Sequence, residues 1–395
     1  MKKSDLAVTA TFLALLFGLG ISFWLCPDRD FSETENRVLT PAPALSLADW
    51  RDGSFSSALT AYYADQFPLR AASVGLHAVS ELALGKREAG GVLLGDDGQL
   101  AVRRHDMYIS RTERAEDTDI YRTEHVEAGV EALVKLDATL QADGRSLCVL
   151  LPPRTVDVTA HSLPYPSTLS DALDETVRDR LAGINHVPLL AELRARYDAG
   201  EYVYFRTDHH WTVRGAYIAY AAVMKALGLS SETLPEDFFT VRAIPRFFGT
   251  THARAGLPRV APDTLEIYVA SDGSDGRYTV RDERGATVIE SGFVSEKFLS
   301  TKDKYGALLD GTHRLLTVTD KTAPAGTRPR LLLAKDSFGS ALAPFLARHF
   351  DVVAVNISGG MTDLSALAAE YGCDRVLVVC NLENLLASDC LARVR

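Results

Sequence analysis

The chain has 395 residues, which is enough for one large domain with additions or for two domains. Its 42 basic and 52 acidic residues give a net charge of −10, which argues against nucleic acid as a partner and against a polybasic grip on anionic lipid. The apolar content of 47% predicts a folded chain with a substantial core.

The N-terminal segment predicts a helix that spans a membrane. Lysines at its start precede an apolar stretch from Leu6 to Leu25, and about 20 such residues match the thickness of the hydrocarbon layer. The lysines favour a cytoplasmic N-terminus, so everything after Cys26 is expected outside the cytoplasm. A cleaved signal peptide is the alternative, but Phe23-Trp24-Leu25 lacks the small residues that a signal peptidase requires. We therefore expect a single-pass signal anchor in the plasma membrane over residues 1–27.

Residues 28–110 are interpreted as a juxtamembrane linker and an N-terminal segment. Phe31 to Pro43 is polar and contains prolines, which is typical of a linker. Leu45 to Arg70 carries apolar and aromatic residues at helical spacing and predicts a helix that ends at Pro68. Short apolar runs at 92–94 and 99–102 predict a hairpin.

Residues 111–395 show the alternation of an α/β domain. Strands are predicted at 146–151, 202–205, 330–334, 352–355 and 375–379, with a short strand or loop at 187–190, and helices at 123–142, 170–181, 213–227, 338–349 and 363–371. Strands without polar alternation, separated by helices, indicate a parallel sheet covered by helices on both faces. Between about 247 and 305 the alternation breaks, and runs at 265–269, 277–280 and 286–289 predict a small antiparallel β insertion.

The five cysteines form neither a C-x-x-C pair nor a zinc-ligand spacing. Cys148 and Cys380 lie inside apolar, strand-like runs and are expected to be small core residues. Outside the cell, a pair among Cys373, Cys380 and Cys390 is able to oxidise, but the sequence does not select one.

Ser337 follows the apolar strand predicted at 330–334 and precedes a predicted helix. Open α/β sheets bind ligands at the carboxyl ends of their strands, and the first amides of the following helix suit a developing oxyanion. A nucleophile is therefore one interpretation of this serine. The alternative is that Asp336 and Ser337 only cap the helix.

Asp208, His209 and His210 stand just before another predicted helix, which Thr212 is able to cap. A histidine needs an acceptor on one ring nitrogen to present the other to a serine, and a carboxylate supplies it. In extended backbone Asp208 and His210 point to the same face and His209 to the other. The alternatives are a pre-helix loop and a metal site, although three adjacent ligands rarely converge on one ion. Combined with Ser337, the pattern favours a Ser-His-Asp acyl-transfer site.

The run Thr207–Thr212 (TDHHWT), followed by Arg214-Gly215-Ala216-Tyr217, resembles the signature of the DHHW proteins. These are relatives of the alginate O-acetyltransferases of the SGNH-hydrolase superfamily, whose matching segment reads Asp-x-His-Trp-Thr. Further segments resemble family blocks in the same order: 31–37 (FSETENR), 65–70 (DQFPLR), 248–250 (FGT), 303–306 (DKYG) and 335–339 (KDSFG). The resemblance extends from Phe31 to about Asn384.

The resemblance implies an SGNH-like fold with a permuted order, in which the nucleophile comes late. Asp208 matches the family's triad acid, His210 its base and Ser337 its nucleophile, while His209 falls on the variable position. The sequence implies no metal and no organic cofactor for this chemistry.

Other residues are candidates for binding the oxyanion or substrate. The backbone amide of Ser337 is the first choice of oxyanion donor, with Tyr305 and Asn384 as weaker choices. Arg154 is expected either at the edge of the active site or at the surface. Trp211 is expected to pack beneath the site, the alternative being an aromatic plane for a sugar ring.

We therefore expect an extracytoplasmic O-acetyltransferase that moves acetyl groups onto an exported or cell-surface polysaccharide through an acyl-serine. Because acetyl-CoA is cytoplasmic, the resemblance implies a membrane-bound O-acyltransferase as the partner that relays acetyl groups. One alternative is a carbohydrate acetyl esterase with the same triad. Another is a non-catalytic binding or assembly factor of a polysaccharide-export complex.

Overall fold

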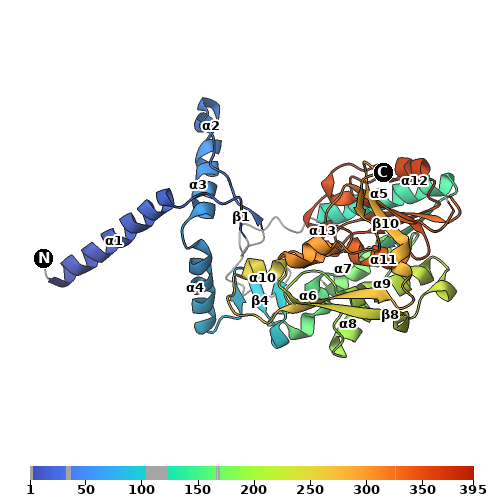
Figure 1. The fold of residues 1–395 in the computed structure, drawn as a ribbon, viewed down its shortest axis with the longest axis horizontal. Helices are drawn as coiled ribbons and strands as arrows, with labels where there is room; N and C mark the ends of the chain where they lie inside the picture. The colour runs from blue at the N-terminus through green and yellow to red at the C-terminus, as the bar shows by residue number, and fades with distance from the viewer. Residues whose placement is uncertain (1–2, 33–36, 104–122, 166, 168–169, 325) are drawn as a thin grey trace. The chain divides into compact units, whose positions relative to one another are not determined.

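The computed structural model describes residues 3–32, 37–103, 123–165, 167, 170–324 and 326–395 (Figure 1). They form two compact units, the smaller from Met1–Gly90 and His252–Val260 and the larger from Gly91–Thr251 and Ala261–Arg395. Every residue that the sequence nominates for chemistry belongs to the larger unit. The division into segments 1–27, 28–110 and 111–395 stays a prediction, since its second boundary falls outside the described residues.

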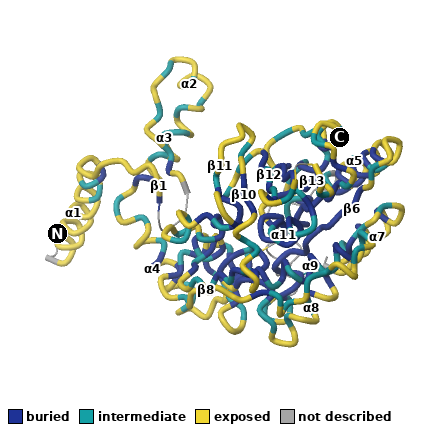
Figure 2. The backbone as a smooth tube through the Cα atoms, turned by 45° about the vertical axis from the view of Figure 1, so that its right-hand side comes forward, coloured by how far each residue is buried: buried dark blue, intermediate teal, exposed yellow. Residues whose placement is uncertain are grey.

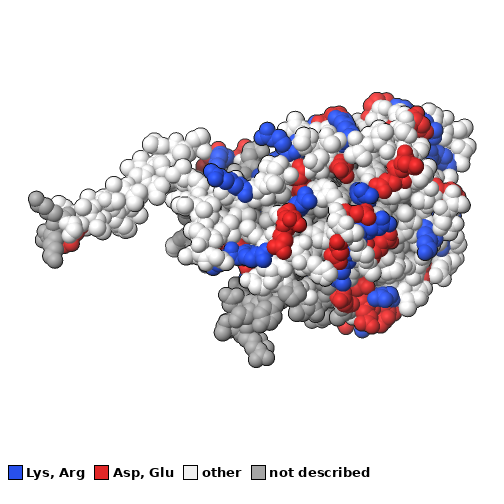
Figure 3. All heavy atoms as spheres, turned by 90° about the horizontal axis from the view of Figure 1, so that it is seen from below, with Lys and Arg blue, Asp and Glu red and all other residues white. Residues whose placement is uncertain are grey.

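The smaller unit is mostly helical. Its elements are α1 (Lys3–Leu25), β1 (Phe31–Ser32), β2 (Arg37–Val38), α2 (Leu47–Asp52), α3 (Ser54–Gln66), α4 (Arg70–Ala83) and β3 (Glu88–Ala89). The helix α1 is long and apolar enough to cross a membrane. After Asp5 the sequence of α1 contains no charged residue. Figure 3 accordingly shows neither blue nor red side chains along the rest of this helix. Of the family-like block at 31–37, residues 33–36 lie outside the described part of the chain.

The single helix predicted between Leu45 and Arg70 is wrong. The chain breaks at Gly53, whose φ of 83° ends α2 and is accessible to glycine without a steric penalty. It breaks again at Pro68, because a proline disfavours helical backbone at the residue before it, and Phe67 is extended there. Helical spacing of the apolar residues does not reveal the break at Gly53, whereas the end of the helix at Pro68 is as predicted.

The larger unit is built on an eight-stranded mixed sheet in the order β11-β10-β12-β14-β13-β15-β6-β7. These strands are β6 (Ser146–Leu150), β7 (Asn185–Val187), β10 (Tyr278–Asp282), β11 (Thr287–Ile289), β12 (Leu315–Asp320), β13 (Arg330–Lys335), β14 (Asp351–Asn356) and β15 (Arg375–Val379). From β14 to β7 all neighbours are parallel, whereas β12, β10 and β11 continue the sheet antiparallel.

Helices cover both faces of this sheet, as predicted, and the side chains of β13 alternate between them. Leu331 and Leu333 join the core on one face, and Leu332 and Ala334 join the core on the other. The first face packs against α8 (Leu190–Asp198), α9 (Val213–Ala226) and α11 (Gly339–Leu346), and the second against α5 (Thr123–Ala142), α7 (Ser170–Arg180), α12 (Leu364–Tyr371) and α13 (Leu382–Ala387). Figure 2 shows β13 and β6 as buried between the two layers.

Smaller elements complete the unit. They are β4 (Val92–Leu94), β5 (Leu100–Val102), α6 (Thr155–Val158), β8 (Phe239–Phe247), α10 (Thr250–Ala255) and β9 (Asp263–Ala270). Strands β4 and β5 pair as the predicted hairpin. One boundary between the two units falls within α10. The predicted β insertion is divided between two sheets: β9 pairs with β8 in a separate sheet, while β10 and β11 extend the main one. Helix α8 was not predicted.

The segment 202–205 is not a strand of the sheet. It doubles back on the residues that follow it through a single bridge between Tyr204 and Trp211. The amide of Phe205 donates to the carbonyl of His210 (3.2 Å), and the amide of Thr212 to that of Val203 (2.9 Å). Its apolar composition therefore reflects a buried loop.

Helix α5 provides a test of the packing, because neighbouring residues on it differ in burial. Leu133 is 0% exposed and Val134 is 47% exposed. Leu133→Ala is expected to lower the free energy of unfolding by about 2–5 kcal/mol, since it leaves a cavity in the core. Val134→Ala is expected to change it by less than about 0.5 kcal/mol. Urea unfolding followed by tryptophan fluorescence measures both, and equal losses would contradict the burial of this face.

Candidate active site

Ser337 lies in the turn between β13 and α11, where it is exposed while both of its neighbours are buried. The buried carboxylate of Asp336 holds this turn. It accepts from the amide of Phe338 (2.9 Å) and, on its other oxygen, from the amide of Asn381 (2.7 Å) and from Asn384 Nδ2 (2.8 Å). Burial raises the pKa of Asp336, and these hydrogen bonds offset the rise only in part.

His210 joins this serine to Asp208. Its Nε2 lies 2.7 Å from Ser337 Oγ, and its Nδ1 lies 2.5 Å from Asp208 Oδ1. An ionised carboxylate only accepts hydrogen bonds, so the proton of the neutral imidazole belongs on Nδ1 and Nε2 accepts the hydroxyl of Ser337. The three residues nominated from the sequence thus form one hydrogen-bonded chain, with the geometry of a nucleophile, a base and a carboxylate.

The second oxygen of Asp208 is held by Thr250. Both the amide (2.8 Å) and the hydroxyl (3.0 Å) of Thr250 donate to Asp208 Oδ2. Burial alone would raise the pKa of Asp208, but the adjacent imidazoles of His210 and His209 and these hydrogen bonds hold it well below its usual range. The backbone at residue 249 passes so close to Asp208 that only glycine fits there, since an added Cβ would stand 2.2 Å from Asp208 Cβ. The block 248–250, noted only as a family-like motif, therefore lines the site.

Asp263 fixes the loop that leads into Asp208. Its carboxylate accepts from the hydroxyl of Tyr202 (2.5 Å), the amide of Arg206 (3.1 Å) and both the amide (2.7 Å) and hydroxyl (2.6 Å) of Thr207. Sequence reasoning missed this residue. It stands at the start of β9, and no motif marks it.

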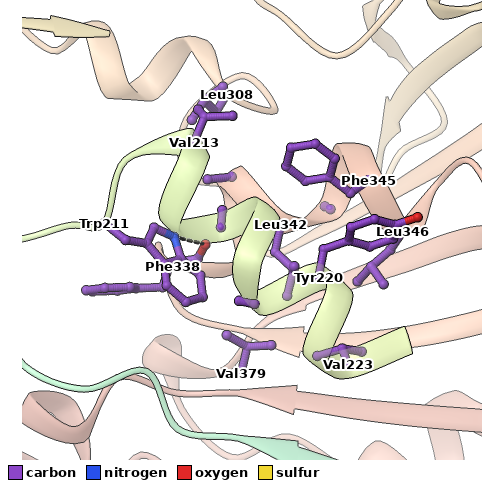
Figure 4. Close-up of a cluster of buried hydrophobic side chains, with 14 of the residues drawn as sticks. Trp211, Val213, Tyr220, Val223, Leu308, Phe338, Leu342, Phe345, Leu346 and Val379 are labelled. Carbon is purple, nitrogen blue, oxygen red and sulfur yellow. Dashed lines mark hydrogen bonds between the residues drawn. The ribbon is translucent and has the colours of Figure 1, made fainter. Parts of the chain in front are cut away.

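Tyr305 and Trp211 support the imidazole and the turn. The ring of Tyr305 stacks on that of His210 with centroids 3.9 Å apart, and its hydroxyl donates to the carbonyl of Ser337 (3.2 Å). Burial and the charge of Asp208 raise the pKa of Tyr305, which keeps the hydroxyl protonated. Trp211 is fully buried against Phe338 and donates to its carbonyl (Figure 4). Trp211 therefore packs beneath the site and presents no face to a sugar.

The remaining oxyanion candidates differ in what they bind. Asn384 Nδ2 donates to Asp336, so it supports the turn that carries Ser337. The amide of Ser337 donates to no group among the described residues, which leaves it available to an oxyanion. Its role as oxyanion donor stays a prediction.

Arg154 is buried, which excludes the surface position. Its guanidinium binds both oxygens of Asp157 at 2.7 and 2.8 Å, and the pair caps α6. The next residue, Thr155, donates its hydroxyl to the carbonyl of His209 (2.9 Å). Arg154, Thr155 and His209 line one small pocket. Arg154 thus lies beside the triad loop, and a role in binding substrate stays a prediction.

The ligand atoms of Asp208, His209 and His210 lie within 4.8 Å of one another, so three adjacent residues do converge here. No other group of three such residues converges in this way within the described part of the chain. Both nitrogens of His210 are already hydrogen-bonded, to Asp208 and to Ser337. A metal ion at this position would have to displace one of these bonds, so the arrangement fits a hydrogen-bonded triad better.

Lys335 ends β13 one residue before Asp336 and is buried. Its Nζ donates to the hydroxyl of Ser340 (2.9 Å). Burial lowers the pKa of Lys335 to about 8, and the charge of Asp336 opposes this only in part. Gly339 packs against its stem, because an added Cβ would meet Lys335 Cβ at 2.5 Å.

We expect Gly249→Ala to disturb the triad, because the new methyl group would push Asp208 away from His210. The rate at which phenylmethanesulfonyl fluoride modifies Ser337 should fall by about 100-fold, as expected for a displacement of about 1 Å. Gly276→Ala is the matched control, since its added Cβ would have only Ser291 Oγ within reach, at 3.7 Å. Equal labelling rates for both variants, measured by mass spectrometry, would contradict the contact.

Lys335 predicts a pH dependence of stability. The unfolded lysine keeps its proton up to a pKa of 10.5 and the folded one only up to about 8. Between these values the unfolded state binds more protons, so the wild type gains free energy of unfolding as the pH rises, by about 3 kcal/mol at most. Lys335→Met should lack this gain. Urea unfolding at pH 7.5 to 10.5 measures the difference, and parallel profiles would argue that the lysine is not desolvated.

Comparison with known proteins shows what the chain is similar to. Residues 109–271 match the family described as "SGNH hydrolase-like domain, acetyltransferase AlgX". A probable alginate O-acetylase AlgJ of Pseudomonas syringae is 27% identical over 196 residues, which cover 48% of this chain and 47% of that protein. The chain spans about half the length of the curated relatives it matches.

Solved structures share the fold. PatB1 of Bacillus cereus with a sulfonyl adduct superimposes with a TM-score of 0.59 at 19% identity, covering 77% of this chain and 100% of that one. A DHHW family protein from Eubacterium siraeum gives 0.56 at 19% identity, covering 77% and 95%. The chain is thus similar to the alginate O-acetyltransferase group of the SGNH-hydrolase superfamily and shares its fold with a DHHW family protein.

Proposed function

We propose that the protein is an extracytoplasmic, membrane-anchored O-acetyltransferase that acts on a polysaccharide through Asp208, His210 and Ser337. The observation that carries this proposal is the continuous hydrogen-bonded chain from a buried carboxylate through an imidazole to an exposed serine hydroxyl. Exposure of Ser337 allows a bulky donor and acceptor to reach it. The family match at residues 109–271 supports acyl transfer as the chemistry.

In the first half-reaction Ser337 Oγ attacks the carbonyl carbon of an acetyl donor while His210 Nε2 takes the hydroxyl proton. Asp208 holds the imidazole with its proton on Nδ1 and stabilises the imidazolium that forms. The negative charge on the carbonyl oxygen falls beside the amide of Ser337. Collapse of the intermediate leaves acetyl on Ser337, and His210 returns the proton to the departing group.

In the second half-reaction a sugar hydroxyl attacks the acetyl-serine and gives its proton to the same Nε2. The ester bond to Ser337 Oγ breaks, the serine takes the proton back, and the sugar leaves as its acetate ester. Tyr305 supports both steps by keeping the imidazole plane fixed through stacking. Neither half-reaction, as proposed, requires a metal or an organic cofactor.

The apolar helix α1 with lysines at its start supports a site outside the cytoplasm, where acetyl-CoA is absent. A membrane-bound O-acyltransferase is the partner we propose as the acetyl relay, and the anchor would keep Ser337 near it. The curated relatives are named probable alginate O-acetylases, which supports a polysaccharide as acceptor. Acetyl transfer to an exported or cell-surface glycan is therefore the activity we propose.

A carbohydrate acetyl esterase with the same triad is the second candidate. The exposure of Ser337 favours it, since water can also reach an acyl group on this side chain. The two activities differ only in whether water or a sugar hydroxyl collects the acetyl group. A non-catalytic role in a polysaccharide-export complex would instead leave Ser337 unreactive.

The test uses the full-length chain in detergent, beside Ser337→Ala and the control Ser291→Ala, which removes another exposed serine. Each protein receives 4-nitrophenyl acetate, with and without oligosaccharides of neutral, uronate and amino-sugar types. We expect acetyl on Ser337 and on sugar in the wild type and the control, and a rate at least 10³-fold lower in Ser337→Ala, as for loss of a nucleophile.

Mass spectrometry of the protein and of the sugars separates the outcomes. Release of acetate with no acetylated sugar would identify an esterase. Equal, near-background rates in all three folded proteins would overturn the triad and leave the binding role.

A further inference from the structure

The sulfur atoms of Cys380 and Cys390 lie 3.6 Å apart in a buried position on either side of α13. Cys380 follows the last residue of β15, and Cys390 comes three residues after the end of α13. Cys373 has no sulfur neighbour at this distance among the described residues. The sequence leaves the pairing among these three cysteines open, and the fold brings only Cys380 and Cys390 together.

We infer that Cys380 and Cys390 are a disulfide-forming pair that fastens α13 in the mature protein. The two sulfur atoms are within van der Waals contact at 3.6 Å, and forming the bond requires them to approach to about 2.05 Å. An extracytoplasmic location, which belongs to the proposed function, supplies the oxidising surroundings in which such bonds persist.

The two thiols differ in reactivity. The hydrogen bond between the two thiols lowers the pKa of Cys390 to about 7, whereas the same bond and complete burial raise that of Cys380. Cys390 also keeps 7% of its surface exposed, while Cys380 has none. The thiolate of Cys390 is therefore the group that meets an external oxidant first.

The reaction needs an external disulfide, either a small molecule or a thiol-oxidising protein. The thiolate of Cys390 attacks one sulfur of that disulfide, which forms a mixed disulfide and releases the other sulfur as a thiolate. Cys380 then loses its proton and attacks Cys390 Sγ, which closes the intramolecular bond and releases the second thiolate. Two thiols of the protein are oxidised and one external disulfide is reduced to two thiols.

The bond would close a ring around the residues that hold the nucleophile turn. The amide of Asn381 and the side chain of Asn384 both donate to Asp336, which positions the turn of Ser337. Cys390 Sγ also contacts the carbonyl of Asn384 at 3.7 Å. The cross-link therefore restrains the segment on which Asp336 depends.

The test uses the full-length wild-type protein in detergent, incubated with glutathione disulfide, denatured without reductant and treated with iodoacetamide. Trypsin leaves both cysteines in one peptide, residues 376–393. We expect this peptide to be two hydrogen atoms lighter and free of alkylation, with its halves still joined after cleavage at Glu383. Cys148 and Cys373 should be alkylated. Alkylation of both Cys380 and Cys390 after oxidation, or a bond from either to Cys373, would overturn the inference.

Thermal unfolding supplies a second readout. Reduction with dithiothreitol should lower the Tm of the oxidised wild type and of the control Cys373→Ser by about 4 °C, because an 11-residue ring no longer restricts the unfolded chain. The double variant Cys380→Ser with Cys390→Ser should not respond to the reductant. An equal response in the double variant would contradict the bond as its source. Neither readout depends on the activity of Ser337, so each tests the disulfide even if the proposed function is wrong.

Discussion

The buried, ionised carboxylate of Asp208 is the constraint on which the rest of the site depends. A charge removed from water is tolerated only when hydrogen-bond donors surround it. The amide and Nδ1 of His210 donate to one oxygen of this carboxylate, and the amide and hydroxyl of Thr250 donate to the other. These four bonds require the backbone to come close on both sides, which explains Gly249, and they require a fixed approach loop, which explains Asp263.

A second buried carboxylate, Asp336, directly precedes Ser337 and has the opposite character. Asp208 faces imidazoles, and its pKa falls, whereas Asp336 faces neutral amide donors, and burial raises its pKa. The pair shows how the surroundings assign different tasks to the same side chain. Asp208 holds the imidazole of His210 and, in the proposed reaction, would balance the charge of the imidazolium. Asp336 acts on backbone geometry and holds the turn from which Ser337 projects.

The sequence predicts four of the five parallel strands, β6, β13, β14 and β15, and the three residues of the hydrogen-bonded chain, because both leave local signatures. For β7 the sequence leaves open a short strand or a loop. Unbroken apolar runs mark β13, β14 and β15, and the DHHW-like motif marks Asp208 and His210. The antiparallel strands of the sheet edge could not be assigned, since their pairing is set by β12, which no pattern singled out. Asp263 and the true partners of Tyr305 and Asn384 depend on contacts between distant segments, which one-dimensional spacing does not encode.

The strand order also governs how this chain reaches its native state. Strand β6 is completed early in synthesis, but its parallel neighbour β15 ends close to the C-terminus, with Ser146 paired to Arg375. Until that strand emerges, one edge of β6 has unpaired backbone groups, and such an edge invites pairing with other chains. Non-local pairing of this kind slows folding. A chain whose synthesis stops before residue 375 is consequently a candidate for chaperone binding or aggregation, even when its N-terminal half has folded correctly.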